Sequence, residues 1–391
     1  MDKLKLERLN KIAVLGPHDR INFGDFLFPI MLDFALSKTF NSKIELKKFS
    51  LVKADFSHLG AFSSNSYKVL TKSINNNEID TVIVAGGESL TARWNNLYSY
   101  INPYYDKLYQ NTNLRNNRLV RNIPKFILGN KTEFPFIINN LNYTKKNIRH
   151  YYNAVGGASG LNKNQINVLK SANLVGLRDL ASFEYLEKNN LKENIFLVPD
   201  SAIILSDVYP INELPINNFG EYIFLQLSNY KHENKIDDII SQLEKLLSEG
   251  NKIILCPIGT AKGHEDHIIL KKIKENISRD NLILVEGQPT IKEIISYIVN
   301  SKLYIGTSLH GVITAMSYAV PYIALNPKQS KLTSFLKTWS IPELNLAGEL
   351  DSFYSKINQI DFENIKSEIF ENTKTLKNKY YQFINTIAKE L

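Results

Sequence analysis

The chain has 391 residues, 43% of them hydrophobic and 22% charged, a composition that is typical of a globular protein and excludes a disordered one. At roughly 150 residues per domain, this length predicts two domains. The formal net charge of +8 favours anionic ligands, and because no helix-turn-helix, zinc-finger spacing or RNA-binding aromatic signature is present, we expect no nucleic acid.

The start of the chain and its single cysteine indicate where the protein works. Residues 1–10 are charged and contain no signal peptide, and no apolar run approaches the roughly 20 residues that span a bilayer. Cys256 lies in an apolar run and has no second cysteine with which to form an internal disulfide. We therefore expect a cytoplasmic protein, with peripheral contact at the inner face of the cell membrane as an open option.

Short β-rich runs alternate with amphipathic stretches along most of the chain, which predicts parallel sheets covered by helices. In the first half, a helix is expected over residues 25–37 and strands over residues 12–16, 81–85, 152–156, 174–177 and 195–198. Residues 206–220 contain prolines and several asparagines without a helical period, so the linker is expected at 208–220.

Strand and helix patterns start again after this linker. Strands are expected over 222–227, 253–257, 282–285, 303–305 and 322–325, and helices over 237–249, 265–276 and 291–299. The prediction is an α/β protein with Rossmann-like domains at 1–207 and 221–345, and with C-terminal helices over 346–391 that pack back on the first domain.

The first expected strand is followed by Asn22-Phe23-Gly24-Asp25 at the start of a helix. Asp25 either caps this helix or, together with Asn22, orients an acceptor hydroxyl and takes its proton. Later strands end in Gly86-Gly87 and in Gly156-Gly157, where glycine permits either tight packing or a close ligand. Neither turn has the spacing of a P-loop or of a dinucleotide-binding loop.

Two charged motifs each allow two interpretations. Arg178 follows a strand and suits a carboxylate or phosphate, or it forms an ion pair with Asp179 or Asp200. The run 264–267, His-Glu-Asp-His, resembles part of a metal site, but acidic residues also favour a helix start. Because no further ligand set with closed spacing is evident, we expect no metal.

Residues 93–152 are both aromatic and basic. They include Arg93, Trp94, Tyr98, Tyr100, Tyr104, Tyr105, Tyr109, Arg115, Arg118, Arg121, Lys125, Lys145, Lys146 and Arg149. Aromatic faces stack on sugars, and the cations suit a diphosphate or a lipid surface. The alternative is a peripheral helical subdomain with a solvated charged face.

Residues 307–325 place a histidine and a glycine between two apolar runs, which predicts strand, tight turn, helix and strand. His310 lies at the turn, where free backbone N–H groups of a helix N-terminus attract anions. It either meets an anionic ligand there or has a structural role as a cap or under a loop.

Taken in order, Asn22 to Asp25, Ala85-Gly86-Gly87, Val155-Gly156-Gly157, the Arg178 strand, Val198-Pro199-Asp200 and Leu309-His310-Gly311 resemble the polysaccharide pyruvyl transferase family. The resemblance implies a GT-B-like fold, with two Rossmann-type domains whose parallel sheets face one another across a cleft. It also implies transfer of a pyruvyl group from phosphoenolpyruvate onto two hydroxyls of a sugar, as a cyclic ketal, without a cofactor. The acceptor would be a surface-polysaccharide precursor, often lipid-linked.

The resemblance also assigns roles, with the acceptor on the first domain and the donor on the second. His310 and Asp25 would be catalytic. The expected donor-binding residues are Arg178, Ser308, Leu309, Gly311, Lys328 and Lys331, and the expected acceptor-binding residues are Asn22, Gly86, Gly87, Glu88, Arg93 and Trp94.

The chain departs from the family at Ser308, where members usually have arginine. A charged hydrogen bond contributes about 1.5 to 3 kcal/mol, so without compensation the donor would bind about 10 to 100 times more weakly. Lys328 or Lys331 could replace the missing charge. Two alternatives follow: a GT-B glycosyltransferase that uses a nucleotide sugar, and a degenerate, non-catalytic family member.

Overall fold

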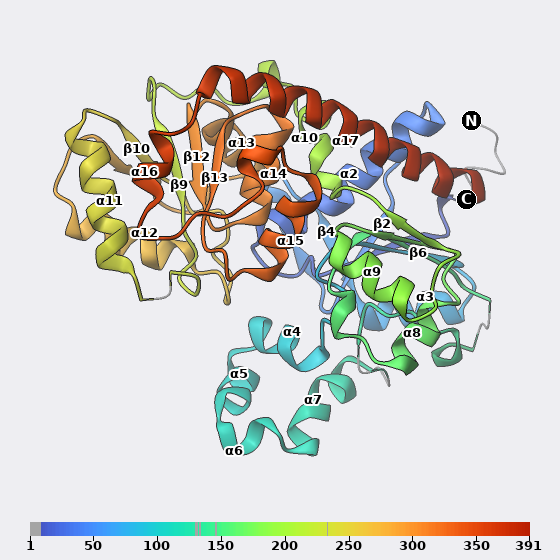
Figure 1. The fold of residues 1–391 in the computed structure, drawn as a ribbon. Helices are drawn as coiled ribbons and strands as arrows, with labels where there is room; N and C mark the ends of the chain where they lie inside the picture. Colours follow the sequence, from blue (N-terminus) through green and yellow to red (C-terminus); the bar gives the residue numbers. More distant parts are fainter. Residues whose placement is uncertain (1–8, 130–131, 133, 145–146, 233) are drawn as a thin grey trace. The chain divides into compact units, whose positions relative to one another are not determined.

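The computed structural model describes residues 9–129, 132, 134–144, 147–232 and 234–391, so Lys145 and Lys146 lie outside the described residues. The chain divides into two units (Figure 1). The first unit contains residues 9–57, Ala61–Ser201 and Tyr380–Leu391, and the second contains His58–Gly60 and Ala202–Lys379. The domain boundaries expected from the sequence stay predictions.

The first unit is built on a sheet whose order is β3-β4-β2-β1-β5-β6-β7-β8. Its strands are β1 Ile12–Leu15, β2 Lys47–Ser50, β3 Ala54–Asp55, β4 Ser63–Ser66, β5 Thr81–Gly87, β6 Arg149–Val155, β7 Leu174–Leu177 and β8 Ile195–Leu197. All neighbours are parallel except β3 and β4. β1 and β5 are buried along their whole length, as expected for parallel strands covered on both faces.

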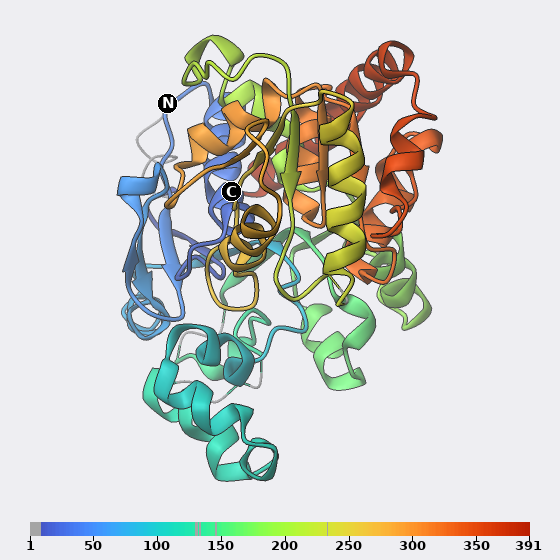
Figure 2. The same cartoon turned by 90° about the vertical axis from the view of Figure 1, so that its left-hand side faces the viewer.

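The helices of the first unit follow these strands. They are α2 Phe23–Phe40, α3 Tyr67–Asn75, α4 Trp94–Ile101, α5 Pro103–Gln110, α6 Thr112–Arg115, α7 Arg118–Leu128, α8 Lys163–Leu169 and α9 Leu180–Lys188. Short 3-10 turns lie at η1 Ser57–Leu59, η2 Asn140–Asn142, η3 Ala158–Gly160 and η4 Ser201–Ile204. Of these turns, η1 and η4 continue into residues of the second unit. In both views α4 to α7 project away from the sheet of this unit (Figures 1 and 2).

The second unit has a fully parallel sheet of order β11-β10-β9-β12-β13. Its strands are β9 Ile223–Gln226, β10 Ile253–Leu255, β11 Leu282–Leu284, β12 Leu303–Gly306 and β13 Tyr322–Ala324. Its helices are α10 Leu205–Val208, α11 Ile236–Ser248, α12 Asp266–Asn276, α13 Ile291–Val299, α14 Leu309–Ser317, α15 Ser330–Trp339 and α16 Phe353–Ile357, with η5 Ile211–Glu213 and η6 Pro342–Leu344.

The long helix α17 Phe362–Glu390 contributes residues to both units, and from Tyr380 onward they belong to the first. Tyr380 Oη accepts a hydrogen bond of 3.1 Å from Asn153 Nδ2 on β6. A Cβ on Gly176 would lie 2.6 Å from the ring of Phe383, so β7 and this helix are in close contact. The side chains of Tyr380, Phe383 and Ile384 are buried, which makes this stretch part of the first unit's core.

Each sheet has one point at which its strand order reverses. In the first unit the chain runs outward from β1 to β2 and β4, and then returns to the other side of β1 with β5. In the second unit it runs from β9 to β10 and β11, and returns beside β9 with β12. In open parallel sheets, ligands bind outside the carboxyl ends of the strands at such a switch point. The loops after β1, β5, β9 and β12 are therefore the places to look for a site.

Candidate functional site

The loop after β12 forms the N-terminus of α14 in the second unit. Ser308 is the N-cap of this helix, and its Oγ accepts a hydrogen bond of 3.4 Å from the backbone N–H of Gly311. His310 is the second helical residue and is partly buried. Helix N-termini attract anions through their free N–H groups and their dipole. Ser308 is thus the cap of this helix, which excludes His310 as the cap residue.

Glycine is required at two positions of this turn because the buried Tyr304 ring crosses it. A Cβ on Gly311 would lie 2.0 Å from Tyr304 Oη, and a Cβ on Gly306 would lie 2.4 Å from the same atom. Burial raises the pKa of the Tyr304 phenol well above its usual value, so this group stays protonated. Leu309 is buried in the core. Leu309 and Gly311 are both expected to bind the donor. Only their backbone groups therefore remain available to contact it.

Lys231 is the residue of this region that the sequence did not reveal. It follows β9, and its Nζ lies 3.5 Å from the carbonyl oxygen of Thr307, directly before the α14 cap. Its own carbonyl oxygen accepts a 2.8 Å hydrogen bond from Asn326 Nδ2. Burial and the nearby Lys331 lower the pKa of Lys231 to about 7, against the opposing effect of Asp266.

The cations expected from the sequence belong to the same region. Lys331 is near enough to Lys231 to depress its pKa, and the backbone N–H of Lys328 donates to Asn326 Oδ1 at 3.0 Å. The positive charge of Lys331 disfavours the charged form of Lys231, and a bound anion would favour that form. This part of the second unit is therefore suited to an anionic ligand.

Asp266 lies beneath these loops with a fully buried carboxyl group. Its Oδ2 accepts hydrogen bonds from Gln226 Nε2 at 2.9 Å and from the backbone N–H groups of Ile258 and Gly259 at 3.1 and 3.0 Å. Within the part of the chain that the structure describes, its Oδ1 has no hydrogen-bond partner. Burial raises the pKa of Asp266 to about 6, although these hydrogen bonds and Lys231 oppose the shift.

The His-Glu-Asp-His run has a structural role, because the carboxyl group of Asp266 points into the protein. Glu265 adopts a φ of 49° and precedes α12, which begins at Asp266. Among the described residues, no group of three or more His, Cys, Asp and Glu side chains is arranged to hold a metal ion.

In the first unit, Arg178 follows β7 and is bound by two carboxylates. Its Nη1 donates to Asp200 Oδ2 at 3.0 Å, its Nη2 donates to Glu88 Oε1 at 3.2 Å, and only 3% of its side chain is exposed. Burial lowers the pKa of Arg178, but Asp200 and Glu88 outweigh this effect and raise it. The ion-pair alternative with Asp200 is therefore the one observed.

The charge balance around Arg178 bears on its expected role in donor binding. Asp179, the N-cap of α9, adds a third carboxylate, and a Cβ on Gly156 would lie 3.2 Å from its Oδ2 and 3.0 Å from Arg178 Nε. One cation thus faces three carboxylates, which disfavours a further anion. Binding of phosphoenolpyruvate by Arg178 has no support in these contacts.

At the start of α2, Asn22 rather than Asp25 is the N-cap, so the expectation that Asp25 caps this helix is wrong. Asn22 Oδ1 accepts a 3.1 Å hydrogen bond from the backbone N–H of Gly24, and Asp25 is the third helical residue. A carboxylate in the first turn is favoured by the helix dipole. The Asn22 amide oxygen is consequently engaged in the cap, while the partly buried Asp25 carboxylate stays a candidate base.

His18 is a second residue that sequence reasoning missed. Its Nδ1 donates to the carbonyl oxygen of Asp25 at 3.0 Å, and its Nε2 has no hydrogen-bond partner among the described residues. Burial is the main cause that lowers the pKa of His18 to about 3, so the ring is neutral at physiological pH. Its position directly after β1 was the only available sequence signal.

The two glycines that end β5 have a packing explanation. Gly86 and Gly87 have φ values of 68° and 75°, and a Cβ on Gly86 would lie 2.2 Å from the ring of Phe28 on α2. The next residue, Glu88, keeps 40% of its side chain exposed although one oxygen binds Arg178. Of the three residues expected to bind the acceptor here, Glu88 alone presents a polar side chain.

Trp94 is a core residue, which corrects the expectation that its face stacks on a sugar. It is 1% exposed, and its ring packs edge-on against Tyr67. Its Nε1 donates to Thr132 Oγ1 at 3.4 Å, and Arg93 lies over the ring of Phe134. Both residues therefore contact the wall of a pocket rather than forming an exposed stacking face.

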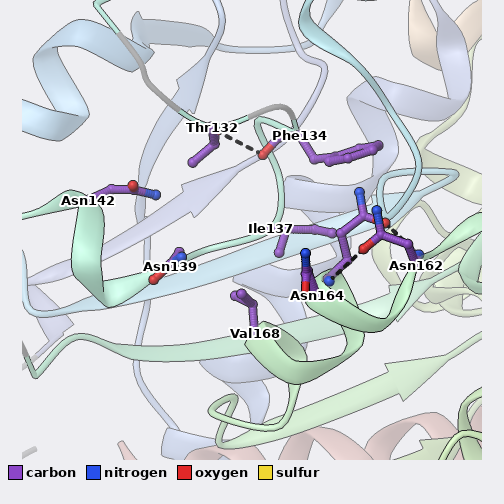
Figure 3. A pocket seen from close by; sticks show the side chains of 9 residues that line it. Thr132, Phe134, Ile137, Asn139, Asn142, Asn162, Asn164 and Val168 are labelled. Carbon is purple, nitrogen blue, oxygen red and sulfur yellow. Dashed lines mark hydrogen bonds between the residues drawn. The ribbon is translucent and has the colours of Figure 1, made fainter.

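That pocket has a volume of about 300 Å³ and lies beside the N-terminus of α8 (Figure 3). Its lining is rich in amides and consists of Thr132, Phe134, Ile137, Asn139, Asn142, Asn162, Asn164, Gln165 and Val168. Asn162 and Gln165 form the capping box of α8, and the buried Gln165 Nε2 has no hydrogen-bond partner within the described residues. Amides beside an aromatic ring match the hydroxyls and apolar faces of sugars.

The structure thus gathers the expected residues in two places. Ser308, His310 and Gly311 lie at the α14 turn near the Lys231 and Lys331 cations, and Glu88 is bound to Arg178 at the carboxyl ends of β5 and β7. Asp25 and Arg178 belong to the first unit and His310 to the second.

Comparison with known proteins identifies a family and a fold. The family model described as polysaccharide pyruvyl transferase matches residues 22–329. Among proteins with curated descriptions, no match is found.

Three solved structures illustrate the fold. S. aureus MnaA with UDP is 14% identical with a TM-score of 0.58, covering 96% of this chain and 93% of that one. UDP-GlcNAc 2-epimerase from Neisseria meningitidis bound to UDP-GlcNAc is 10% identical with a TM-score of 0.57, covering 97% and 99%. The α,α-trehalose 6-phosphate synthase from Burkholderia multivorans is 8% identical with a TM-score of 0.53, covering 97% and 96%. These likenesses confirm the predicted GT-B-like α/β fold class and concern the fold alone.

Proposed function

Because the chain belongs to the polysaccharide pyruvyl transferase family, we propose that it transfers a pyruvyl group from phosphoenolpyruvate onto two hydroxyls of a sugar in a surface-polysaccharide precursor, forming a cyclic ketal. The observation that carries this proposal is the switch point between β9 and β12. There the N-terminus of α14, with His310 in its first turn, lies beside the loop that holds Lys231.

Phosphoenolpyruvate carries a phosphate and a carboxylate, and the second unit offers groups for both. Lys231 and Lys331 supply positive charge, and the first N–H groups of α14 supply hydrogen-bond donors. In this proposal Lys231 compensates for Ser308. The proposed set of cations then has three members, Lys231, Lys328 and Lys331, because Lys328 lies on the neighbouring loop.

His310 is the proposed acid. Its proton adds to C3 of the enol phosphate, the electron pair of the C2–C3 double bond forms the new C–H bond, and C2 becomes cationic. One sugar hydroxyl adds to C2 and loses its proton to a base. The C–O bond to phosphate then breaks, and the second hydroxyl adds to C2 to close the ketal while its proton goes to the departing phosphate. The proton held by the base finally restores His310. Cations around the phosphate stabilise the charge that develops there.

The acceptor groups are proposed to lie on the first unit. Glu88 presents an exposed carboxylate at the end of β5, Asp25 is the candidate base, and the amide-lined pocket suits the rest of a saccharide. The acceptor-binding contributions of Arg93 and Trp94 would then be indirect, through Phe134 and Thr132.

The test is incubation of the protein with phosphoenolpyruvate and a panel of lipid-linked and free saccharides, with release of phosphate and gain of a ketal mass as readouts. His310→Asn is expected to abolish transfer, and Lys231→Met to raise the KM for phosphoenolpyruvate about 10- to 100-fold. Lys337→Met, at an exposed position of α15, is the matched control and should leave transfer unchanged. Failure across a broad acceptor panel would count against the proposal.

A second candidate is a glycosyltransferase with a nucleotide-sugar donor. It is favoured by the UDP and UDP-GlcNAc bound in similar structures and by Ser308 in place of arginine. Stabilisation of the protein by UDP or UDP-sugars, but not by phosphoenolpyruvate, would support it. A degenerate, non-catalytic member would instead keep its biological phenotype when His310 is replaced by alanine.

A further inference from the structure

The helices α4 to α7 form a folded group within the first unit. Tyr98, Tyr105 and Tyr109 are buried and pack ring against ring, and Tyr105 Oη donates to the carbonyl oxygen of Val120 at 3.2 Å. Trp94 anchors the group in the core. The side chains that α5 and α7 leave outside are therefore displayed on a defined surface.

That surface is unusually apolar. Phe126 is 90% exposed, Leu119 is 79% exposed and Tyr104 is 81% exposed. Leu119, the partly buried Ile123, Phe126 and the half-exposed Ile127 fall at positions i, i+4, i+7 and i+8 of α7, so they form one stripe along the helix.

The adjoining side of α7 packs inward, because Val120, Pro124 and Leu128 are buried and Ile123 packs against the same core. The stripe of Leu119, Phe126 and Ile127 is consequently not the face that holds α7 to its own unit. Large exposed apolar side chains in a row indicate an interaction site rather than ordinary surface.

The charge of this segment is positive. Residues 94–128 contain the five basic residues Lys107, Arg115, Arg118, Arg121 and Lys125 and one acidic residue, Asp106, a difference of +4 out of the +8 of the whole chain. Asp106 is buried, so the exposed charge is basic. Arg118 and Lys125, seven residues apart, form a basic edge of α7 that lies about a quarter turn from Phe126.

We propose that α5 and α7 dock this protein on an anionic lipid bilayer, with α7 lying in the plane of the interface. Its apolar stripe would enter the boundary between headgroups and acyl chains, and its basic edge would contact acidic headgroups. Charge complementarity favours this occupant over a protein, since an apolar protein groove does not require a basic rim, and over nucleic acid, which gains little from an exposed Phe and Leu. Among the described residues, no helix is long and apolar enough to cross a membrane.

Binding to the bilayer does not depend on the proposed function. Only its purpose does, which is to bring the enzyme to lipid-linked acceptors. The test is flotation of the full chain with phosphatidylcholine vesicles, with and without phosphatidylglycerol. We expect binding only to the anionic vesicles, and weaker binding as salt is raised.

The double variant Leu119→Ser/Phe126→Ser should reduce binding about tenfold or more, and Arg118→Gln or Lys125→Gln about fivefold each. Phe370→Ser is the matched control, because Phe370 is a 59% exposed phenylalanine on α17 outside this segment. Thermal unfolding and transfer to a free saccharide should be unchanged in all four variants, which separates a failure of docking from a failure of the proposed reaction.

Three outcomes would overturn the proposal. The first is equal binding to neutral and anionic vesicles without salt dependence, and the second is unchanged binding in the Leu119/Phe126 variant. The third is that the protein does not bind vesicles but forms a dimer or an RNA complex, and that the same variant disrupts this complex. Such a result would assign the surface to that partner.

Discussion

Gly311 lies where the ring of Tyr304 crosses the first turn of α14. A methyl group there would overlap the phenol oxygen at 2.0 Å and the ring carbon Cζ at 2.4 Å. The ring is fully buried and has little room to move. The glycine of the Leu-His-Gly motif is thus explained by packing, and it fixes the backbone that carries His310.

Gly311→Ala is expected to destabilise the protein by about 1 to 3 kcal/mol, as overpacking of a filled core does, and to lower kcat/KM for transfer. Gly348→Ala is the control in the same unit, because its nearest neighbour would lie 3.5 Å from the new methyl group. Chemical denaturation of both variants checks this. A Gly311→Ala protein as stable as the wild type would show that Tyr304 can move aside.

Lys231 gives the donor site a distinct pH dependence. An anion bound beside Lys231 favours the ammonium form, so the pKa of about 7 in the free protein should rise on binding and a proton should be taken up. Phosphoenolpyruvate affinity is therefore expected to fall as the pH rises from about 7 to about 9. Calorimetric titration in buffers of different ionisation enthalpy measures the proton uptake, which Lys231→Met should remove and Lys337→Met should retain.

The same residue affects stability without a ligand. Because the pKa of Lys231 is lowered in the folded state, the unfolded chain binds more protons between pH 7 and the usual lysine pKa near 10.5. Stability should therefore rise with pH over this window, and the rise should be smaller in Lys231→Met. An equal slope in both proteins would contradict the burial of this ammonium group.

At the scale of elements, the ends of β5, β7 and β8 are joined by Arg178. Its partner Asp200 is fully buried, so removing the guanidinium leaves an uncompensated charge. Breaking a buried ion pair from one side typically costs 3 to 5 kcal/mol. This contact therefore has a structural function whether or not a ligand also approaches it.

Arg178→Met is expected to lower stability by about 3 to 5 kcal/mol, and Arg178→Met/Asp200→Asn to recover most of this loss. Thermal melts measure the stability, and titration with phosphoenolpyruvate measures the donor affinity. If the double variant regains stability but loses donor affinity, Arg178 binds the donor directly and our structural interpretation is wrong.

The same elements show what sequence patterns can and cannot predict. The apolar strands β1, β5, β7 and β12 were predicted within about two residues at either end, because buried parallel strands read as short apolar runs. β2 and β4, with the sequences KKFS and SSNS, were missed, since their polar residues hide a strand pattern. Lys48 on β2 is nevertheless buried and pairs with Asp33 on α2.

The candidate site was predictable only in part, for a related reason. Motifs at strand ends pointed to Glu88, Arg178 and His310, but strand order cannot be obtained from periodicity. Without that order, nothing placed the loop with Lys231 beside the loop with Thr307, and the ion pair of Arg178 with Asp200 was one of several open alternatives. Partners far apart in sequence decided whether each motif residue was exposed, capped or paired.

At the scale of the whole molecule, the first unit is discontinuous in sequence. Its core includes Tyr380, Phe383, Ile384 and Ile387, which are buried on the C-terminal part of α17. Tyr380 contacts β6 through Asn153, and Phe383 contacts β7 at Gly176.

Ile384→Ala/Ile387→Ala is expected to destabilise the first unit, with each truncated side chain costing about 2 to 5 kcal/mol. Amide hydrogen exchange should accelerate in β6 and β7 and remain slow in β9 and β12. Gln382→Ala, an exposed position on the same helix, is the control. Unchanged exchange in β6 and β7 would show that these residues are dispensable for the unit.

Because of this discontinuity, the two parts of the first unit are synthesised at different times. At about 5 to 20 residues per second, a ribosome needs roughly 10 to 40 s to proceed from Ser201 to residues 380–391. During that interval one face of β6 and β7 lacks its cover, and the second unit, which extends to Lys379, is itself made in full only at the end of it. The first unit, although translated first, should therefore finish folding only when the last turns of α17 have been made, at nearly the same moment as the second.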